Sequence, residues 1–437
     1  MTATQHEPGR TGRGSDAPAS TKPRRRWGRP TLYTSYGQEM ALLNTRAKQL
    51  GVLAIIAVAA YLPLTLEDDL LALLGTGLVL AVGAIGLNLL IGYAGQVSLG
   101  HAFFVGVGAY TAAVLAGDPD GRYLGFGVSE APVWIVAAGV VAALFGVVVA
   151  PLATRLRGLY LAVVTLGLVF IGQYFFAEWR EMSGGPGIGR ESAVPVVLGN
   201  DLTRDGAYTE EQKLFWLFLV VLVIMALLGR NIARSRIGRA FAAVRDRDIA
   251  AGVMGVELGR YKLIAFTISS FFAGVCGSLL YVGSGQFSPE QFGLLLSVQF
   301  IAMVLIGGVA TISGSIMGAL LIALLPRLSS ELPAFLPFVS DRPTDHPNVF
   351  EVEVGLYGAL IVAFLLFEPR GLFGIWLRIR TYWIHHPHHP HHPHHPHHTD
   401  DRDADVPAHH RRNREKKRAT ARGARGRDDP GPGRLRP

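Results

Sequence analysis

The feature that most constrains this chain is a series of apolar runs, several of which are long enough to span a bilayer. A transmembrane helix needs about 20 predominantly apolar residues. Half of the 437 residues are hydrophobic and 17% are charged, whereas soluble domains carry about 25% charged residues. The sequence therefore predicts an all-α membrane protein, a polytopic bundle of about ten transmembrane helices. These spans are expected near Leu50–Leu66, Leu70–Gly92, His101–Ala116, Pro132–Thr154, Gly158–Glu178, Leu214–Gly229, Lys262–Gly283, Leu294–Gly308, Ser313–Pro326 and Glu351–Phe367.

The charges of the connecting loops predict the orientation, because loops rich in Lys and Arg stay on the cytoplasmic side. If all ten spans cross, the basic segments share one side: Arg24–Arg29, Arg155–Arg157, Arg230–Lys262 and Arg370–Arg380. The other loops then share the opposite side: Glu67–Asp69, Asp118–Glu130, Met182–Gln212 and Arg327–Phe350. Both termini are thus expected in the cytoplasm. His101–Ala116 and Ser313–Pro326 are short enough to be re-entrant instead, but losing one would break this arrangement.

The composition of the two ends predicts three parts. Residues 1–46 read as a disordered basic arm, residues 47–380 as the transmembrane domain, and residues 381–437 as a disordered His/Pro-rich and charged tail. The tail includes HHPHHPHHPHHPHH at 385–398, which could bind Ni, Zn or Cu loosely, although a tail without a specific metal role is favoured. The net charge of +8 sits in tails and short loops, which argues against a nucleic-acid partner and for contact with the lipid bilayer.

The loop 230–262 is the longest basic interruption between apolar runs, with eight Lys or Arg against three Asp or Glu. Its middle part, Gly238–Ala251, fits a short amphipathic helix. Phe241, Val244 and Ile249 fall on one side of that helix, and Arg239 and Asp246 fall on the other. A helix in such a loop can dock into a groove of a partner protein. Equally, the loop could only fix the orientation of the spans.

Two stretches place polar and small residues at membrane depth, Asn88–His101 and Leu305–Ser315. Broken backbone in hydrocarbon must be buried in protein or line a wet cavity, so these stretches are candidates for a translocation path. The candidate residues are Asn88, Gly92, Gly95, Gln96, Ser98, Gly100, His101, Gly307, Gly308, Thr311, Ser313 and Gly314. Alternatively, the glycines serve helix packing and the polar groups bond locally. His101 alone is more often a structural residue than a ligand.

Four stretches carry a resemblance to a known family: Gly86–Gly108, Leu156–Gly187, Gly238–Leu280 and Phe367–Gly374. In their order and spacing the chain resembles the permease subunits of branched-chain amino-acid ABC importers, in particular the LivM-like branch. The resemblance spans roughly residues 50–378. Urea-type permeases are close relatives of this branch.

The resemblance implies partners and a role for the basic loop. In this family two related permeases pair in the membrane, each meets an ATP-binding subunit through a coupling helix, and an extracytoplasmic binding protein delivers the substrate. The E-A-A-x-x-x-G motif that marks such a contact matches Ala250, Ala251 and Gly255, with Ile249 in the place of the acid. The implied coupling residues are Arg239, Phe241, Arg245, Asp246, Asp248, Ala250, Ala251 and Gly255.

The chain itself is expected to be non-catalytic. It has no G-x-x-x-x-G-K-[ST] phosphate loop, so ATP and Mg are expected on the partner ATPase, with no cofactor or metal on this chain. His101 and Ser98 do not form a convincing catalytic pair. The resemblance implies import of Leu, Ile and Val across a prokaryotic plasma membrane. Urea, amides or other amino acids stay open as substrates, and a secondary transporter or channel stays open as a class.

Overall fold

The computed structural model describes residues 46–156, 158–204, 206–330, 349–368 and 370–385. One compact unit extends to Ile379, and a second begins at Arg380, of which only the end of one helix is described. The predicted N-terminal arm, apart from its last residue, and the predicted His-rich tail beyond His385 lie outside the described residues. The disorder expected for both therefore stays a prediction.

Each of the ten predicted apolar segments coincides with a helix. These helices are α2 (Arg46–Tyr61), α3 (Asp68–Asn88), α4 (His101–Ala116), α5 (Ala131–Arg155), α6 (Leu159–Glu178), α8 (Glu210–Arg234), α11 (Leu258–Gly283), α12 (Leu294–Gly307), α13 (Ile312–Ser330) and α15 (Val349–Phe367). Among the described residues, α3, α5, α6, α8 and α11 are long and apolar enough to cross a membrane, and the other five are shorter apolar helices. The class of all-α membrane protein is confirmed, whereas ten crossings and two cytoplasmic termini remain predictions.

Smaller elements connect these helices. A 3-10 turn, η1 (Leu62–Leu64), follows α2, and a π-helical turn, η2 (Leu89–Tyr93), continues α3. The remaining elements are α7 (Arg180–Ser183), β1 (Arg190–Glu191), β2 (Val196–Val197), β3 (Asn200–Asp201), α9 (Arg236–Asp246), α10 (Asp248–Val253), β4 (Gln286–Phe287), η3 (Pro289–Phe292) and α16 (Gly371–His385). Strand β1 pairs antiparallel with β4, and β2 with β3. The segment Arg370–Arg380, expected as a basic loop, is mostly helical in α16.

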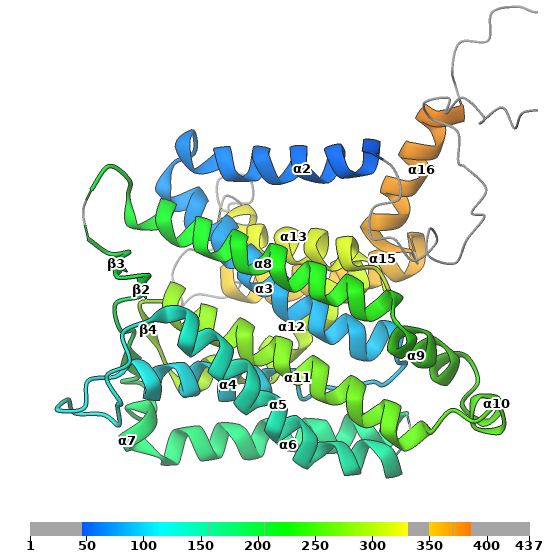
Figure 1. Cartoon of the computed structure of the whole chain (residues 1–437), viewed down its shortest axis with the longest axis horizontal. Helices are drawn as coiled ribbons and strands as arrows, with labels where there is room; N and C mark the ends of the chain where they lie inside the picture. The colour runs from blue at the N-terminus through cyan, green and yellow to red at the C-terminus, as the bar shows by residue number, and fades with distance from the viewer. Residues whose placement is uncertain (1–45, 157, 205, 331–348, 369, 386–437) are drawn as a thin grey trace, which may run out of the picture. The chain divides into compact units, whose positions relative to one another are not determined.

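Helices α3 and α11 form the centre of the bundle (Figure 1). From Gly77 to Asn88 every residue of α3 is buried, which fits a helix that is apolar on all sides and enclosed by others. Helices α13, α11 and α8 pack around α3, while α5 and α4 pack on α11. The outer surfaces of α5 and α6 expose large apolar side chains, among them Val148, Leu159 and Ile171, as expected of surfaces that face lipid.

Helix α4 approaches α11 closely because glycines line their contact. A Cβ atom at Gly108 would collide with the backbone of Gly274, and a Cβ at Gly277 would collide with the carbonyl of Val105. Small residues let helix backbones approach in membranes, where packing rather than hydrophobicity drives association. This contact fixes α4, which is only 16 residues long and mostly buried, inside the bundle.

A Gly277→Ala substitution is therefore expected to destabilise the purified protein, because the added methyl has to push two backbones apart. Overpacking of this kind costs about 1–3 kcal/mol, so we expect a lower thermal unfolding midpoint in detergent. Gly167→Ala is the matched control, since no atom lies within 4 Å of a Cβ built at Gly167. Equal midpoints for the two variants would contradict the close packing of α4 on α11.

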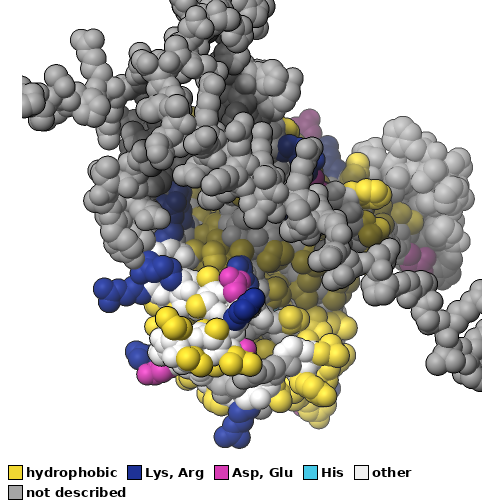
Figure 2. All heavy atoms as spheres, turned by 90° about the vertical axis from the view of Figure 1, so that its right-hand side faces the viewer, with side chains coloured by type: hydrophobic (Ala, Val, Ile, Leu, Met, Phe, Trp, Pro, Cys, Tyr) yellow, Lys and Arg dark blue, Asp and Glu magenta, His cyan; other side chains and the backbone are white. Residues whose placement is uncertain are grey.

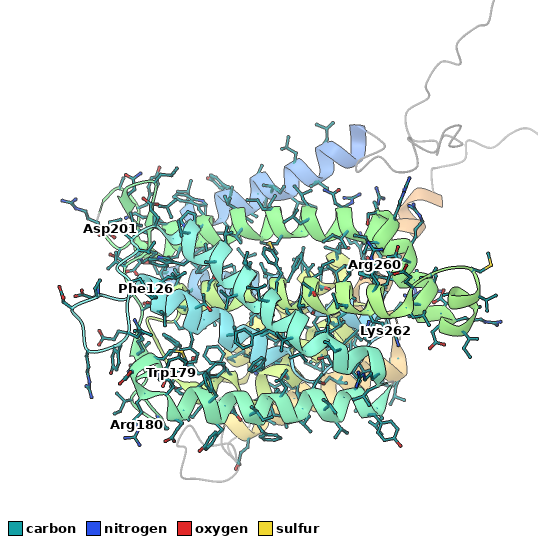
Figure 3. The ribbon with its side chains drawn as sticks, turned by 60° about the horizontal axis from the view of Figure 1, so that its bottom comes forward. Phe126, Trp179, Arg180, Asp201, Arg260 and Lys262 are labelled. Carbon is teal, nitrogen blue, oxygen red and sulfur yellow. The ribbon has the colours of Figure 1, made fainter. Side chains whose placement is uncertain are left out.

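The two ends of the bundle differ in composition. Figure 3 places Phe126, Trp179, Arg180 and Asp201 at one end and Arg260 and Lys262 at the other. The first end carries the four short strands and α7, and the second carries α9 and α10 (Figure 1). Trp179 is 43% exposed where α6 ends, as is typical of aromatic side chains at a membrane interface.

Candidate coupling site and translocation path

Helix α9 begins at an N-cap serine and packs against the bundle through buried apolar side chains. Ser235 is its N-cap, and the Ser235 hydroxyl accepts hydrogen bonds from the N–H groups of Ile237 and Gly238. Such caps satisfy the N–H groups that a helix start leaves unpaired. Phe241 is fully buried and Val244 is 6% exposed, and the helix packs against α8, α11 and η2. The sequence prediction that these two residues share one face is confirmed.

The prediction of one continuous helix over Gly238–Ala251 is wrong. Arg247 has an extended backbone (φ −155°, ψ 91°) and separates α9 from α10. Because the chain turns there, Ile249 does not continue the buried face of Phe241 and is 74% exposed. Gly255 follows α10 with φ of 86°, a left-handed conformation that side-chain-bearing residues rarely adopt.

Helix α10 presents an apolar surface that the sequence reasoning did not single out. We call Ile249, Val253 and Met254 the α10 apolar group; the last two are each 84% exposed. Figure 2 looks onto this end of the bundle, where basic side chains project around hydrophobic ones. Of the predicted coupling residues, Ala250 is exposed and Ala251 is buried. An exposed apolar group on a short helix that connects two long apolar helices is a typical contact surface for another protein.

Arg245 connects α9 to the first polar stretch. Its Nη1 donates a hydrogen bond of 2.8 Å to the carbonyl oxygen of Gly92, and its Nε lies 2.9 Å from Asp246 Oδ1. Gly95, with φ of 68°, lies so close that a Cβ there would be 2.7 Å from Arg245 Cγ. Arg245 therefore links α9 directly to η2 and to the residues that follow it.

Asn88 joins the two polar stretches, which lie more than 200 residues apart in sequence. Its Nδ2 donates to the carbonyl oxygen of Thr311 (2.9 Å) and to Ser315 Oγ (2.7 Å). Its Oδ1 accepts from the N–H of Ala310 at 2.8 Å. The side chain is fully buried, and burying an amide is costly unless it is hydrogen-bonded. We call Asn88 and residues 308–315 the Asn88 clamp.

The other predicted residues of the first stretch have structural contacts. A ring nitrogen of His101 lies 3.0 Å from the Gly83 carbonyl oxygen, and its ring packs edge-on against Phe300. Ser98 Oγ accepts from the N–H of Gly100 at 3.3 Å. These contacts favour the packing interpretation for His101, Ser98 and Gly100. Gln96 differs from them, because neither polar atom of its buried side chain has a hydrogen-bond partner in the part of the chain that the structure describes.

The second stretch is a break between α12 and α13. Gly308 has φ of 129° and its carbonyl oxygen accepts from Thr311 Oγ1 at 2.7 Å, while Gly307 and Gly314 pack backbone against backbone. Ser313 falls within the clamp segment, but it is exposed and is not among the residues that Asn88 bonds. Ser315 was not among the predicted residues, although it lies four residues after Thr311 and thus on the same helical face.

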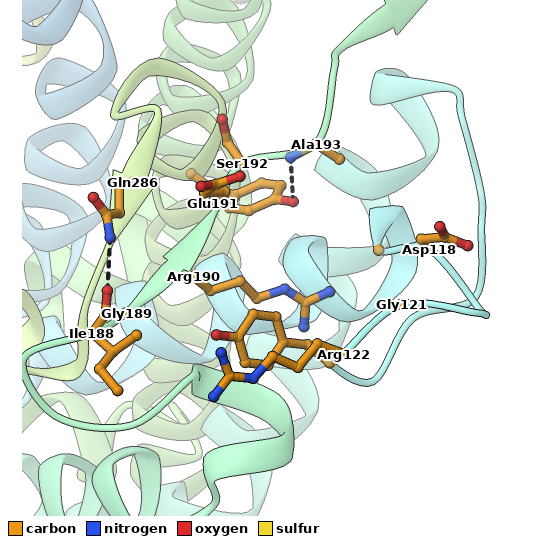
Figure 4. Close-up of a pocket in the computed structure, with 13 residues that line it drawn as sticks. Asp118, Gly121, Arg122, Ile188, Gly189, Arg190, Glu191, Ser192, Ala193 and Gln286 are labelled. Atoms are coloured by element: carbon orange, nitrogen blue, oxygen red, sulfur yellow. Dashed lines mark hydrogen bonds between the residues drawn. The ribbon is translucent and has the colours of Figure 1, made fainter.

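Hydrogen bonds organise the opposite end of the bundle around Arg190, in a cavity of about 530 Å³ (Figure 4). The Arg190 guanidinium donates to the carbonyl oxygens of Ala113 (2.6 Å), Leu124 (2.9 Å) and Met182 (3.1 Å). Burial lowers the pKa of Arg190 from its ordinary value, and three neighbouring tyrosines oppose that shift. This arginine therefore ties the loop at Leu124 and helix α7 to the end of α4. Among the described residues, His, Cys, Asp and Glu form no group of three or more that could hold a metal ion.

Comparison with known proteins places the chain among transport proteins. Residues 70–365 match the family model described as the permease component of branched-chain amino acid transport systems. The high-affinity branched-chain amino acid transport system permease protein LivM of Salmonella typhimurium is 29% identical over 346 residues, which cover 75% of this chain and 76% of LivM.

Two further relatives carry similar names. BraD of Pseudomonas aeruginosa, also a high-affinity branched-chain amino acid transport system permease protein, is 25% identical over 69% of this chain and 93% of its own length. LivH of Escherichia coli is 27% identical over 41% of this chain and 52% of its own length. No solved structure matches the chain significantly.

Proposed function

Since the chain belongs to the permease family of branched-chain amino acid transport systems, we propose that it is a transmembrane permease subunit of an ABC importer for leucine, isoleucine and valine. The family and the apolar helices make it a multi-pass membrane protein. We place it in the prokaryotic plasma membrane with both termini inside. The names of LivM and BraD support the substrate class, and LivH supports a second, related permease as partner.

The energy for transport comes, in this proposal, from two separate ATP-binding subunits that hydrolyse MgATP. The observation that most supports the proposal is how α9 and α10 are arranged at their end of the bundle. The α10 apolar group projects outward, whereas α9 is packed inward through Phe241 and Val244. Helix α10 is therefore assigned as the segment that docks into an ATPase groove, and α9 as the segment that transmits the motion.

The hydrogen bonds suggest how the motion reaches the spans. Arg245 on α9 holds the carbonyl oxygen of Gly92 in η2. Asn88, one turn earlier, holds the backbone between α12 and α13. A shift of α9 on ATP binding is thus expected to move η2 and the Asn88 clamp together. Alternating access between two permeases requires such a set of groups with different contacts in two states. An extracytoplasmic binding protein is expected to deliver substrate at the opposite end.

The test is to purify the full-length chain from its own membrane and identify the companions by mass. Recovery of an ATP-binding subunit and a second permease, with ATP-dependent uptake of leucine by the reconstituted complex, is the expected result. Uptake of urea rather than leucine would reject the substrate class. A chain that purifies alone and transports in response to an ion gradient would reject the importer and favour a secondary transporter.

An Arg245→Met substitution should uncouple hydrolysis from transport, because methionine keeps an apolar stem but cannot donate to Gly92. Hydrogen bonds to charged groups contribute about 1.5–3 kcal/mol, so uptake is expected to fall roughly ten- to hundredfold while ATP hydrolysis by the complex continues. Arg260→Met is the control, since the Arg260 side chain is 70% exposed and its nearest Glu257 oxygen is 3.9 Å away. Equal uptake by the two variants would reject the transmission step.

A further inference from the structure

A second cavity, of about 230 Å³, lies at the end of the bundle that carries α9 and α10. Four parts of the chain meet around it: the residues after η2, the junction of α5 with α6, the corner between α9 and α10, and the start of α11. Lys262, from α11, is labelled at this end in Figure 3. The cavity therefore touches both the coupling helices and the broken first stretch.

Gln96 gives the first indication that this cavity holds a ligand. It lines the cavity and is 5% exposed, and neither its Nε2 nor its Oε1 has a hydrogen-bond partner among the described residues. Burying an amide without partners is costly, and such groups in native proteins call for an explanation. Once the Gln96 amide turns toward the cavity, a polar molecule bound there would supply the partners that the described residues do not.

The other lining residues indicate the chemistry of that molecule. Two acidic residues, Asp246 and Asp248, line the cavity together with three basic ones, Arg245, Arg247 and Lys262. Asp246 is paired with Arg245. Apolar side chains of Leu156, Leu161 and Val244 line it as well. Pockets that bind small molecules combine an apolar lining with a few polar groups that fix orientation. Groups of both charges beside apolar side chains match a zwitterionic amino acid that has an aliphatic side chain.

We propose that this cavity binds a free aliphatic α-amino acid from the cytoplasm and that the bound amino acid slows further import. In the proposed contacts, Arg247 and Lys262 face the ligand carboxylate, Asp246 and Asp248 face its ammonium group, and the Gln96 amide pairs with it. The identity of the amino acid and the side of entry rest on the proposed function.

The position of the cavity explains why occupancy would affect transport. Its lining includes Arg245 and Gly95, the two residues whose close contact connects α9 to the first stretch. A ligand that binds more tightly when α9 contacts the first polar stretch shifts the conformational equilibrium toward the state in which they are in contact. The size of the shift is set by the difference in its affinity for the two states. Accumulated product would then hold the coupling helices in one state and reduce the rate of the next cycle.

The experiment measures binding of radiolabelled leucine to the purified full-length chain in lipid nanodiscs, by equilibrium dialysis and without binding protein or ATPase. We expect saturable binding with a dissociation constant of about 1 mM or lower. Leucinamide, which lacks the carboxylate, and 4-methylpentanoate, which lacks the ammonium group, should compete at least about tenfold less well than leucine.

Two variants test the location of the site. Gln96→Leu and, separately, Arg247→Glu are each expected to weaken leucine binding at least about tenfold. Gln291→Leu is the matched control and should bind normally, because Gln291 is exposed in η3 and does not line the cavity. Arg247 is exposed between two helices, so its variant keeps the test valid if Gln96→Leu fails to fold. Absence of saturable binding to the wild-type chain, or normal binding by Arg247→Glu, overturns the proposal.

A transport measurement separates this proposal from the proposed function. Proteoliposomes of the complete transporter preloaded with millimolar leucine should import leucine several-fold more slowly than vesicles preloaded with acetate, and Arg247→Glu should reduce that difference. Leucine import that is insensitive to internal leucine rejects the regulatory site but leaves the importer assignment intact. Binding of leucine to the chain combined with import of a different substrate rejects the substrate class but keeps the site.

Discussion

Import is expected to fall to background in an Asn88→Leu variant, the largest effect of a single substitution that the structure predicts. Leucine has similar size but leaves the buried N–H of Ala310 without the acceptor it has now. It also removes the donor toward Ser315 Oγ and toward the Thr311 carbonyl oxygen, which keeps its bond from the Ser315 N–H. Each buried polar group left unpaired costs about 1–3 kcal/mol. The backbone between α12 and α13 should therefore lose its fixed geometry, with a lower unfolding midpoint as well as lost import.

Two comparisons make this prediction specific. Asn88→Asp keeps the shape and the acceptor toward Ala310 but removes the donor toward Thr311 and Ser315, so it should also lose import. Asn231→Leu is the matched control and should import normally, because Asn231 is exposed on α8. Normal leucine uptake by Asn88→Leu, at equal amounts of inserted protein, would show that the Asn88 clamp is dispensable.

The second large effect is expected at the α10 apolar group. A double variant with Val253→Ser and Met254→Ser should insert and fold normally, since both side chains are 84% exposed. It should nevertheless fail to retain an ATP-binding subunit during purification. Buried apolar anchors at protein interfaces contribute about 2 kcal/mol each when they are hot spots, so losing two weakens association roughly a thousandfold.

The control for this variant lies at the other end of the bundle. Val194→Ser with Leu198→Ser also removes two exposed apolar side chains, which are 47% and 86% exposed. Those residues lie beside β2, far from α10, and their loss should leave the ATPase attached. If both double variants retain the ATP-binding subunit equally well, α10 is not the docking helix.

Much of the fold could be predicted because apolar length is a local property of the sequence. Each of the ten predicted segments coincides with a helix, and the short segment His101–Ala116 is α4. Helix α16 was missed, since its mixture of apolar and basic residues reads as a basic loop that follows a span. The sequence also placed Phe241 and Val244 on one side of a helix, because their spacing alone determines that.

Less of the candidate site than of the fold could be predicted from the sequence. A pattern of periodic apolar residues does not reveal a turn of the backbone, so Ile249 was assigned to the same face as Phe241. The one local signal was Asp248, an acidic residue suited to the first turn of a new helix. The two polar stretches were each predicted from the sequence. Their contact through Asn88 was not, because it joins residues 223 positions apart in the chain and leaves no local signal in the sequence.

That separation has a consequence for the synthesis of the protein. A ribosome adds about 5–20 residues per second, so roughly ten to forty-five seconds pass between the synthesis of Asn88 and that of Thr311. During this interval α3 has already been made, yet the amide that it carries has none of its final partners. The hydrogen bonds of Asn88 can therefore form only after residues 308–315 have been synthesised. Until then, α3 has to associate with the other early helices without them. The final packing of α3 thus depends, through the Asn88 side chain, on the synthesis of the segment that begins α13.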